Sequence, residues 1–271
     1  MARDGAPLQN YVLKDGVLRC VAQAPAAFYK EDPARVLALF TAAAAKNCTV
    51  DVDTYEAALS AAPGIQRLPT AAVREAVQNI LLSDVPQALG PLLSGGALGP
   101  YGLAGTGECL HVLKEVPCTM ETRWWVLLRL CRAQYALVCE KFGFSQGFAG
   151  TLAGLDRLAA VPHLPQSVSE LKQLLSRLPE FDYEAAVKTL LRQDMRWAGQ
   201  LALYDSLCES REPYRLRHLA VTPAELAAQG ITGARAAWVL HGMLDAVIKA
   251  PSLNTQPALM ALAGVLAGQY R

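Results

Sequence analysis

The stretch KEDPARVL, residues 30–37, decides how the chain is organised, because strand-like sequence precedes it and helical sequence follows it. Asp32 is suited to cap a helix, Pro33 to occupy its first position, and early carboxylates favour the helix dipole. Asp32 and Arg35 lie three residues apart and therefore share one face of the expected helix. Such a carboxylate and guanidinium could also read the hydrogen-bonding edge of a nucleotide base. From these residues alone, a well-capped helix start and a base-reading site both remain open.

The sequence before this stretch has strand character. Residues 11–13 and 17–21 are short apolar runs on either side of an Asp-Gly turn, which predicts a β-hairpin. An isolated hairpin is only marginally stable in water, so it needs further structure to pack on. We interpret residues 1–28 as the remnant of a larger sheet.

From residue 32 onward, apolar residues recur at helical spacing, and most segments carry helix start or stop signals. One long helix is expected over residues 121–142. Thr222, Pro223 and Glu225 form a capping-box start, and Gly230 is suited to end that helix in a left-handed conformation. Helices are expected to begin near residues 32, 53, 70, 85, 121, 145, 167, 182, 197, 222, 233 and 255. The prediction is an all-α fold of many helices with a short β-hairpin at the N-terminus.

Composition agrees with a helical protein. The chain has 271 residues, 52% of them apolar, which suffices for one large domain or two to three small ones. Alanine and leucine are abundant while aromatic residues make up only 7%, which favours helices over sheets. The net charge of +1 excludes a globally basic nucleic-acid binder, so any such surface must be local.

The cysteines and the apolar segments bear on where the protein works. Seven cysteines without a CxxC pair favour free thiols in a reducing cytosol. No signal peptide is recognisable, and the longest apolar stretch, residues 257–268, is shorter than the roughly 20 residues that span a bilayer. We therefore expect a cytoplasmic protein with no membrane partner.

Two groups of candidate metal ligands have simpler interpretations. Cys109, His111 and Cys118 lack the paired spacing of structural zinc sites. Asp51 and Asp53 have DxD spacing, but they fall at the expected start of a helix and are interpreted as capping residues. We assign no catalytic residue and no metal ligand from the sequence.

Two breaks divide the helical part of the chain. Residues 90–107 are dense in glycine, and residues 208–216 combine several charges with a proline. The expected segments are therefore residues 1–28, 29–95, 108–209 and 216–271.

Several motifs, in order along the chain, resemble one enzyme family. GVLRCV at residues 16–21 and EDPAR at residues 31–35 resemble the head-to-neck junction of bacterial CCA-adding tRNA nucleotidyltransferases, which share a family with poly(A) polymerases. TRW at residues 122–124 is similar to the body of that family, and GITG at residues 230–233 is similar to its tail. No single motif is specific, but the resemblance covers nearly the whole chain.

The resemblance implies both an architecture and a nucleotide site. The second, third and fourth segments would be the neck, body and tail, arranged as an elongated helical array behind a remnant of the head sheet. In that family the EDxxR helix start pairs with the base of incoming CTP or ATP. Carried over, Asp32 and Arg35 would read the base, and Glu31 would hold Arg35 in position.

The resemblance also implies an RNA partner. The body and tail would cradle the acceptor stem and elbow of tRNA through shape and phosphate contacts, and DNA is not expected as a partner. The basic residues suit a solvated helix surface equally well, because Glu209 and Glu212 are interleaved with them. The expected RNA-binding residues are Arg192, Arg196, Arg215, Arg217, Gly230, Gly233 and Arg235.

The family's catalytic head precedes its EDxxR motif, and residues 1–30 show no glycine-serine nucleotide loop and no metal-binding carboxylate pair. The chain alone is therefore predicted to be inactive, because Mg²⁺ and CTP or ATP would require the missing head. A separate head chain or a truncated gene would account for this pattern. The alternative is a helical protein-interaction module on the same scaffold, favoured by near-neutral charge and by Ala27 and Ala38, where the family has arginine.

Overall fold

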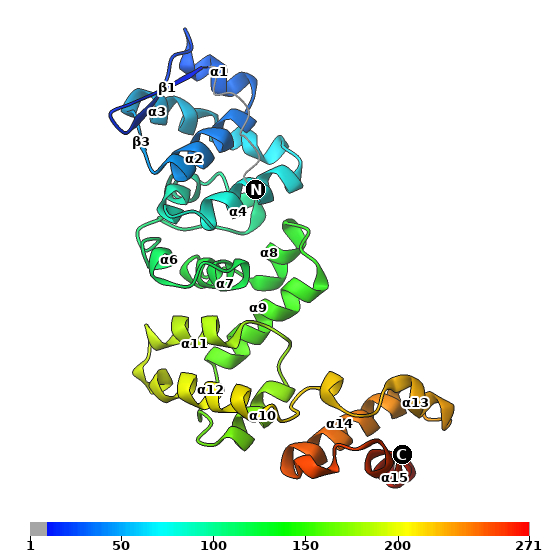
Figure 1. Cartoon of the computed structure of the whole chain (residues 1–271). Helices are drawn as coiled ribbons and strands as arrows, with labels where there is room; N and C mark the ends of the chain where they lie inside the picture. The colour runs from blue at the N-terminus through cyan, green and yellow to red at the C-terminus, as the bar shows by residue number, and fades with distance from the viewer. Residues whose placement is uncertain (1–9, 271) are drawn as a thin grey trace. The chain divides into compact units, whose positions relative to one another are not determined.

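The computed structural model describes residues 10–270, which contain three short strands, fifteen α-helices and six 3₁₀ helices (Figure 1). This confirms the predicted all-α fold with a short hairpin at its N-terminal end. Internal contacts divide the chain into two compact units, one ending at Asp156 and the other beginning at Arg157. The predicted limits of neck, body and tail stay predictions, and each unit is described separately below.

The predicted hairpin is present and belongs to a small sheet. Strands β1 (Tyr11–Lys14) and β2 (Val17–Cys20) pair antiparallel across Asp15 and Gly16, whose φ angles of 51° and 75° suit a type I′ turn. The sequence did not predict β3 (Thr49–Val50), which pairs parallel with β2. The hairpin therefore does have structure to pack on within this chain.

The first unit is helical apart from this sheet. Its 3₁₀ helices are η1 (Ala62–Arg67), η2 (Pro86–Leu89) and η3 (Gly99–Tyr101). Its α-helices are α1 (Pro25–Glu31), α2 (Ala34–Lys46), α3 (Val52–Ala61), α4 (Thr70–Leu81), α5 (Gly90–Ser94), α6 (Val112–Glu115), α7 (Met120–Leu130), α8 (Tyr135–Lys141) and most of α9 (Gln146–Ala159).

The helix boundaries around residue 32 differ from the prediction. Helix α1, which the sequence analysis missed, begins at Pro25 and ends at Glu31. Asp32 and Pro33 then form the join to α2, which begins at Ala34. Pro33, and not the expected Asp32, occupies the N-cap position of α2, but the Asp32 Oδ1 accepts a hydrogen bond from the N–H of Ala34, the first residue of α2, at 3.0 Å. The stretch that opened the sequence analysis is thus a junction of two helices.

The predicted long helix over residues 121–142 is wrong. Helix α7 ends at Leu130, Arg132 has a left-handed φ of 48°, and the Ala133 N–H donates to the Leu128 carbonyl at 2.9 Å. This is a Schellman ending with arginine where glycine is usual, so the sequence carries no visible stop signal there.

A buried arginine joins two helices of the first unit. Arg123 on α7 is 4% exposed, and its Nη1 donates to the carbonyls of Leu81 and Ser83 at 2.6 Å each. Those carbonyls lie at the end of α4, where backbone acceptors lack partners within the helix. Arg123 therefore closes α4 and fixes α7 beside it.

The second unit contains six further α-helices, of which α13, α14 and α15 run from orange to red in Figure 1. Its 3₁₀ helices are η4 (Met195–Gly199), η5 (Leu216–His218) and η6 (Pro251–Leu253). Its α-helices are α10 (Val168–Ser176), α11 (Tyr183–Leu191), α12 (Gln200–Ser210), α13 (Pro223–Ala228), α14 (Gly233–Lys249) and α15 (Gln256–Gln269).

Side chains from distant positions fix the start of α13. Thr222 and Glu225 form the predicted capping box, and Gly230 follows α13 with a left-handed φ of 75°. The Asn254 side chain accepts from the Ala220 N–H at 2.8 Å and donates to the His218 carbonyl at 2.9 Å. The segment from η5 to α13 is thus tied to the residues that precede α15.

The glycine-dense segment of residues 90–107 is ordered within the first unit. Gly107 has a φ of 77°, and a Cβ at this position would lie 2.9 Å from the Gly90 Cα. Both the backbone conformation and the close approach require glycine. Among residues 10–270, no helix has the length and apolar character needed to cross a membrane.

We predict that Arg123→Met lowers the free energy of unfolding by about 3 kcal/mol, because two carbonyls at the end of α4 lose a charged donor. Arg129→Met is the matched control on α7. Arg129 is exposed, and its ion pair with Asp156 is 3.5 Å long and open to solvent, so its loss should cost at most about 1 kcal/mol. Urea unfolding followed by circular dichroism would measure both, and equal effects would contradict the structural role of Arg123.

We predict that Gly107→Ala destabilises the chain by about 2 kcal/mol, because alanine resists this φ and its Cβ meets the Gly90 backbone. In contrast, Gly99→Ala should be nearly neutral, since a Cβ there meets nothing within 4 Å. Thermal unfolding of the two variants is the measurement, and an equal loss in both would show that the close approach is unimportant.

Candidate nucleic-acid interface

The structure brings the three predicted base-reading residues together at the junction of α1 and α2. Nη1 of Arg35 lies 3.1 Å from Oε2 of Glu31, and its Nε lies 3.5 Å from Oδ2 of Asp32. The Arg35 side chain is 31% exposed, while those of Glu31 and Asp32 are 75% and 46% exposed. Exposed pairs of this kind contribute about 0–1 kcal/mol to stability, so a ligand can compete for their atoms at little cost.

An aromatic ring supports Arg35 from the other side. The guanidinium carbon lies 4.2 Å from the centroid of the Phe28 ring, and Nη1 also donates to the Phe28 carbonyl at 2.8 Å. Tyr11 on β1 contacts the same ring edge-on and donates from its hydroxyl to the Arg35 carbonyl at 3.4 Å. Sequence reasoning missed these contacts. Phe28 lies seven residues before Arg35, and its position beside the guanidinium follows only from helix α1, which was not predicted.

The DxD motif acts as a helix cap, as predicted. Oδ2 of Asp51 accepts from the Thr54 N–H at 3.3 Å and caps α3, while Oδ1 accepts from Nη2 of Arg19 at 2.9 Å. The bond from Arg19 is the main reason that the pKa of the Asp51 carboxyl lies below its ordinary value. Within residues 10–270, no group of three or more histidine, cysteine or acidic side chains is placed to hold a metal ion.

The predicted RNA-binding residues of the second unit fall at separate places. Arg192 follows α11 and is exposed, and Arg235 on α14 donates to the Ala267 carbonyl near the end of α15. Gly230 and Gly233, with φ angles of 75° and 59°, flank the loop between α13 and α14. Arg235 thus supports α15, and the two glycines shape a turn.

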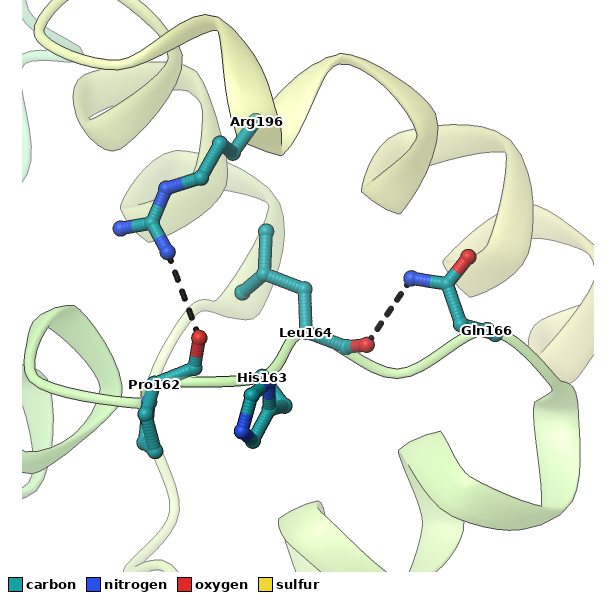
Figure 2. Close-up of a pocket in the computed structure, with 5 residues that line it drawn as sticks. All are labelled: Pro162, His163, Leu164, Gln166 and Arg196. Carbon is teal, nitrogen blue, oxygen red and sulfur yellow. Dashed lines mark hydrogen bonds between the residues drawn. The ribbon is translucent and has the colours of Figure 1, made fainter.

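Arg196 lines a hollow of about 400 Å³ beside the segment that precedes α10. Figure 2 shows its guanidinium directed at the Pro162 carbonyl, at 3.4 Å, and the Gln166 amide directed back to the Leu164 carbonyl. Nε of Arg196 also pairs with Asp194 at 2.7 Å. The charge of Arg196 is thus partly neutralised, and the hollow carries no group suited to acid–base or nucleophilic chemistry beyond His163.

Arg215 and Arg217 are the two predicted residues that lie together. They line a second cleft, of about 350 Å³, formed by residues from α10, α11, α12 and η5. Arg217 pairs with Glu180, and the half-buried Arg215 donates to the Leu178 carbonyl. This cleft is lined by two guanidinium groups and one carboxylate, whereas the hollow is lined by one guanidinium group.

Comparisons with known proteins bear on the fold. No family model and no curated protein matches the sequence. The crystal structure of the Bacillus stearothermophilus CCA-adding enzyme in complex with CTP matches with a TM-score of 0.65 and 18% identity, over 93% of this chain and 66% of that one. The chain is related in fold to the CCA-adding enzymes.

Two further structures agree with this relation. Complexes of a CCA-adding enzyme with CTP and with ATP match with TM-scores of 0.56 and 0.51 and identities of 14% and 13%. These two matches include 93% and 94% of this chain and 63% of each enzyme chain. The chain therefore spans about two thirds of the length of the CCA-adding enzymes it matches. At these identities the likeness concerns the fold.

The pKa of His218, which lies beside the second cleft, is affected by the charges that line this cleft. Partial burial, then the charges of Arg217 and Arg215, lower the pKa of the imidazole below its ordinary 6.5, and Glu180 opposes them. Its Nδ1 lies 3.4 Å from the Tyr214 amide nitrogen and its Nε2 lies 3.4 Å from Nε of Arg217. A neutral ring accepts only one of these hydrogen bonds, and a protonated ring accepts neither.

We predict that stability falls as the pH drops below about 6.5, because a lowered folded-state pKa makes protonation favour the unfolded chain. The contribution of His218 is fully present above that pH and is lost as the pH falls toward the lowered pKa. His218→Gln keeps an acceptor without titrating, so its stability should decline less between pH 7.5 and pH 5. Urea unfolding at both pH values tests this, and parallel declines would contradict it.

Proposed function

We propose that this chain binds tRNA as the neck, body and tail portion of a CCA-adding tRNA nucleotidyltransferase, in tRNA 3′-end processing. The observation that carries the proposal is the match of 93% of the chain to the fold of a CCA-adding enzyme that binds CTP. The arrangement of Glu31, Asp32 and Arg35 supports it independently, because those residues form a solvent-accessible set of base-pairing groups.

In this proposal the junction of α1 and α2 selects the nucleotide. The guanidinium of Arg35 offers donors and Asp32 offers an acceptor, which together complement the edge of cytosine or adenine. Glu31 and the Phe28 ring hold Arg35, so the fork is oriented before the base arrives. A nucleotide is then chosen by protein groups without a nucleic-acid template.

The basic residues of the second unit supply phosphate contacts in this proposal. Arg192, Arg196 and Arg217 are exposed. RNA phosphates can replace Asp194 at Arg196 and Glu180 at Arg217. Arg215, Arg235, Gly230 and Gly233 contribute by shaping the surface. Such contacts give affinity that depends on salt and little on sequence.

The metal-dependent step lies outside the residues assigned here. Phosphoryl transfer by two metal ions needs carboxylates that hold Mg²⁺ over the triphosphate. We infer that a catalytic head, on a separate chain or in additional sequence, supplies these groups together with the bound triphosphate. The 271-residue polypeptide alone is therefore proposed to add no nucleotide.

A filter-binding titration with tRNA tests the RNA-binding proposal. We expect saturable binding at low salt that weakens steeply as salt rises, and weaker binding of a DNA duplex of similar size. Combining Arg192→Ala, Arg196→Ala and Arg217→Ala should lower affinity at least about tenfold and make the salt dependence shallower. No tRNA binding at low salt would overturn the proposal.

A second experiment addresses nucleotide selection. The base contacts lie within this chain although the head would hold the triphosphate, so CTP at millimolar concentration should perturb NMR signals of the α1–α2 junction. Arg35→Ala should weaken this binding about tenfold through loss of a charged fork. Arg67→Ala is the matched control, because Arg67 is exposed on η1 and outside the junction. Equal CTP binding by both variants would exclude Arg35 as the base reader.

Incubation with labelled CTP, ATP, Mg²⁺ and tRNA lacking its 3′ end tests the expected inactivity. No label should enter the tRNA, and incorporation would show that the chain holds its own metal-binding carboxylates.

The second candidate is a helical protein-interaction module without RNA. The ion pairs of Arg196 and Arg217 favour it, since they cancel much of the local positive charge. A pulldown that recovers a protein partner but no RNA would favour this candidate over the first.

A further inference from the structure

The cleft that contains Arg215 and Arg217 also gathers aromatic rings, which neither the sequence resemblance nor the proposed function assigns. The cleft is built within the second unit from the segment between α10 and α11, from α12, and from the segment that enters η5. Its volume of about 350 Å³ is in the range of small-molecule sites. The lining residues that carry the argument are Glu180, Phe181, Tyr204, Tyr214, Arg215 and Arg217.

The positive side of the cleft is suited to an anion. The Arg217 and Glu180 side chains pair while remaining 65% and 57% exposed, so an incoming anion can displace the carboxylate. The guanidinium carbon of Arg215 lies 5.7 Å from the Tyr214 ring centroid, and this side chain is half-buried. The cleft is lined by two guanidinium groups and one carboxylate, and planar guanidinium forks match the oxygens of a phosphate.

The aromatic side of the cleft is suited to a flat ring. The half-buried Tyr204 rests on Tyr183, with ring centroids 4.9 Å apart. Tyr183 is itself buried and donates from its hydroxyl to the Gln200 side chain at 3.4 Å, which fixes the support under Tyr204. Nucleic-acid bases stack on such rings with little regard to sequence.

Protonation states keep these roles constant near neutral pH. Burial raises the pKa of the Tyr204 hydroxyl above its ordinary value, so the ring stays neutral beside an anion. The pKa of His218 is lowered by burial and by both arginines, which agrees with a positive potential at this edge.

We propose that the cleft binds one nucleotide, with its phosphate on Arg217 and Arg215 and its base against Tyr204 and Tyr214. The nucleotide can come from two sources, a free mononucleotide or an unpaired residue of an RNA chain, and in the second case the inference rests on the proposed function. The site is separate from the base-reading residues at the junction of α1 and α2.

Calorimetric titration of the full chain with AMP, adenosine and inorganic phosphate tests the ligand class. AMP should bind with a dissociation constant of about 1 mM or lower, and adenosine and phosphate should each bind at least about tenfold more weakly. Equal binding of AMP and phosphate would overturn the base contact, and equal binding of AMP and adenosine would overturn the phosphate contact.

Variants locate the site. Arg217→Ala and Tyr204→Ala should each lower the affinity for AMP about tenfold. Tyr204→Phe should keep the wild-type affinity, because the ring remains. Glu180→Gln should raise the affinity, because the competing carboxylate is removed. Arg177→Ala is the charge-matched control, since Arg177 is exposed on the adjoining segment and does not line the cleft. Circular dichroism checks that each variant is folded. If Tyr204→Ala unfolds, Arg217→Ala and Glu180→Gln still test the site, because both replaced residues are exposed.

AMP binding that survives Arg217→Ala and is lost in Arg35→Ala would overturn the proposal, because the ligand would then occupy the other site. A single-stranded oligoribonucleotide and tRNA separate the two sources. Tyr204 is not among the phosphate contacts of the proposed function, so Tyr204→Ala is the variant that decides. Weaker binding of both RNA and AMP assigns an unpaired RNA residue, whereas an effect on AMP alone assigns a free nucleotide.

The two proposals fail separately. If AMP does not bind and tRNA binds equally to wild type and Tyr204→Ala, the cleft inference is overturned while the proposed function stands. If AMP depends on Arg217 and Tyr204 but tRNA does not bind, the proposed function fails while the nucleotide cleft stands.

Discussion

The buried guanidinium of Arg123 is the constraint on which the first unit depends. A charge with 4% exposure must find fixed acceptors, and it finds them in the Leu81 and Ser83 carbonyls at the end of α4. Helix α4 packs in turn on α2, which carries Arg35 at its start. The position of the junction of α1 and α2 is therefore linked, through two helix contacts, to a buried arginine on α7.

Some charged side chains in this protein hold the fold together, and others make surface contacts that a ligand can replace. The buried fraction of the side chain distinguishes the two groups. Arg123 is enclosed and has strong carbonyl partners, so replacing it would break the fold. Arg217 keeps most of its surface in solvent and pairs with an equally exposed Glu180, so its partner can change without cost to the core. Arg35 is intermediate, held by an aromatic ring and a carbonyl but still open on one side.

Sequence patterns predicted features that depend on neighbouring residues and missed those that depend on distant ones. The cap at Asp51 and the capping box at Thr222 were predictable because donor and acceptor lie three residues apart. The break at Arg132 was not, since its stop signal is a backbone conformation adopted by an arginine. Likewise, the junction residues were adjacent in sequence, whereas the cleft joins Glu180, Tyr204 and Arg217 from three separate segments.

The Asn254 side chain has a consequence for the order in which the protein forms during synthesis. Its amide holds the Ala220 N–H and the His218 carbonyl, so the η5 segment that carries Arg217 is secured by a residue 36 positions beyond His218. Domains fold from the N-terminal side as the chain leaves the ribosome. The two hydrogen bonds from Asn254 to the η5 segment therefore form only after residue 254 has emerged, so this segment is secured late in synthesis.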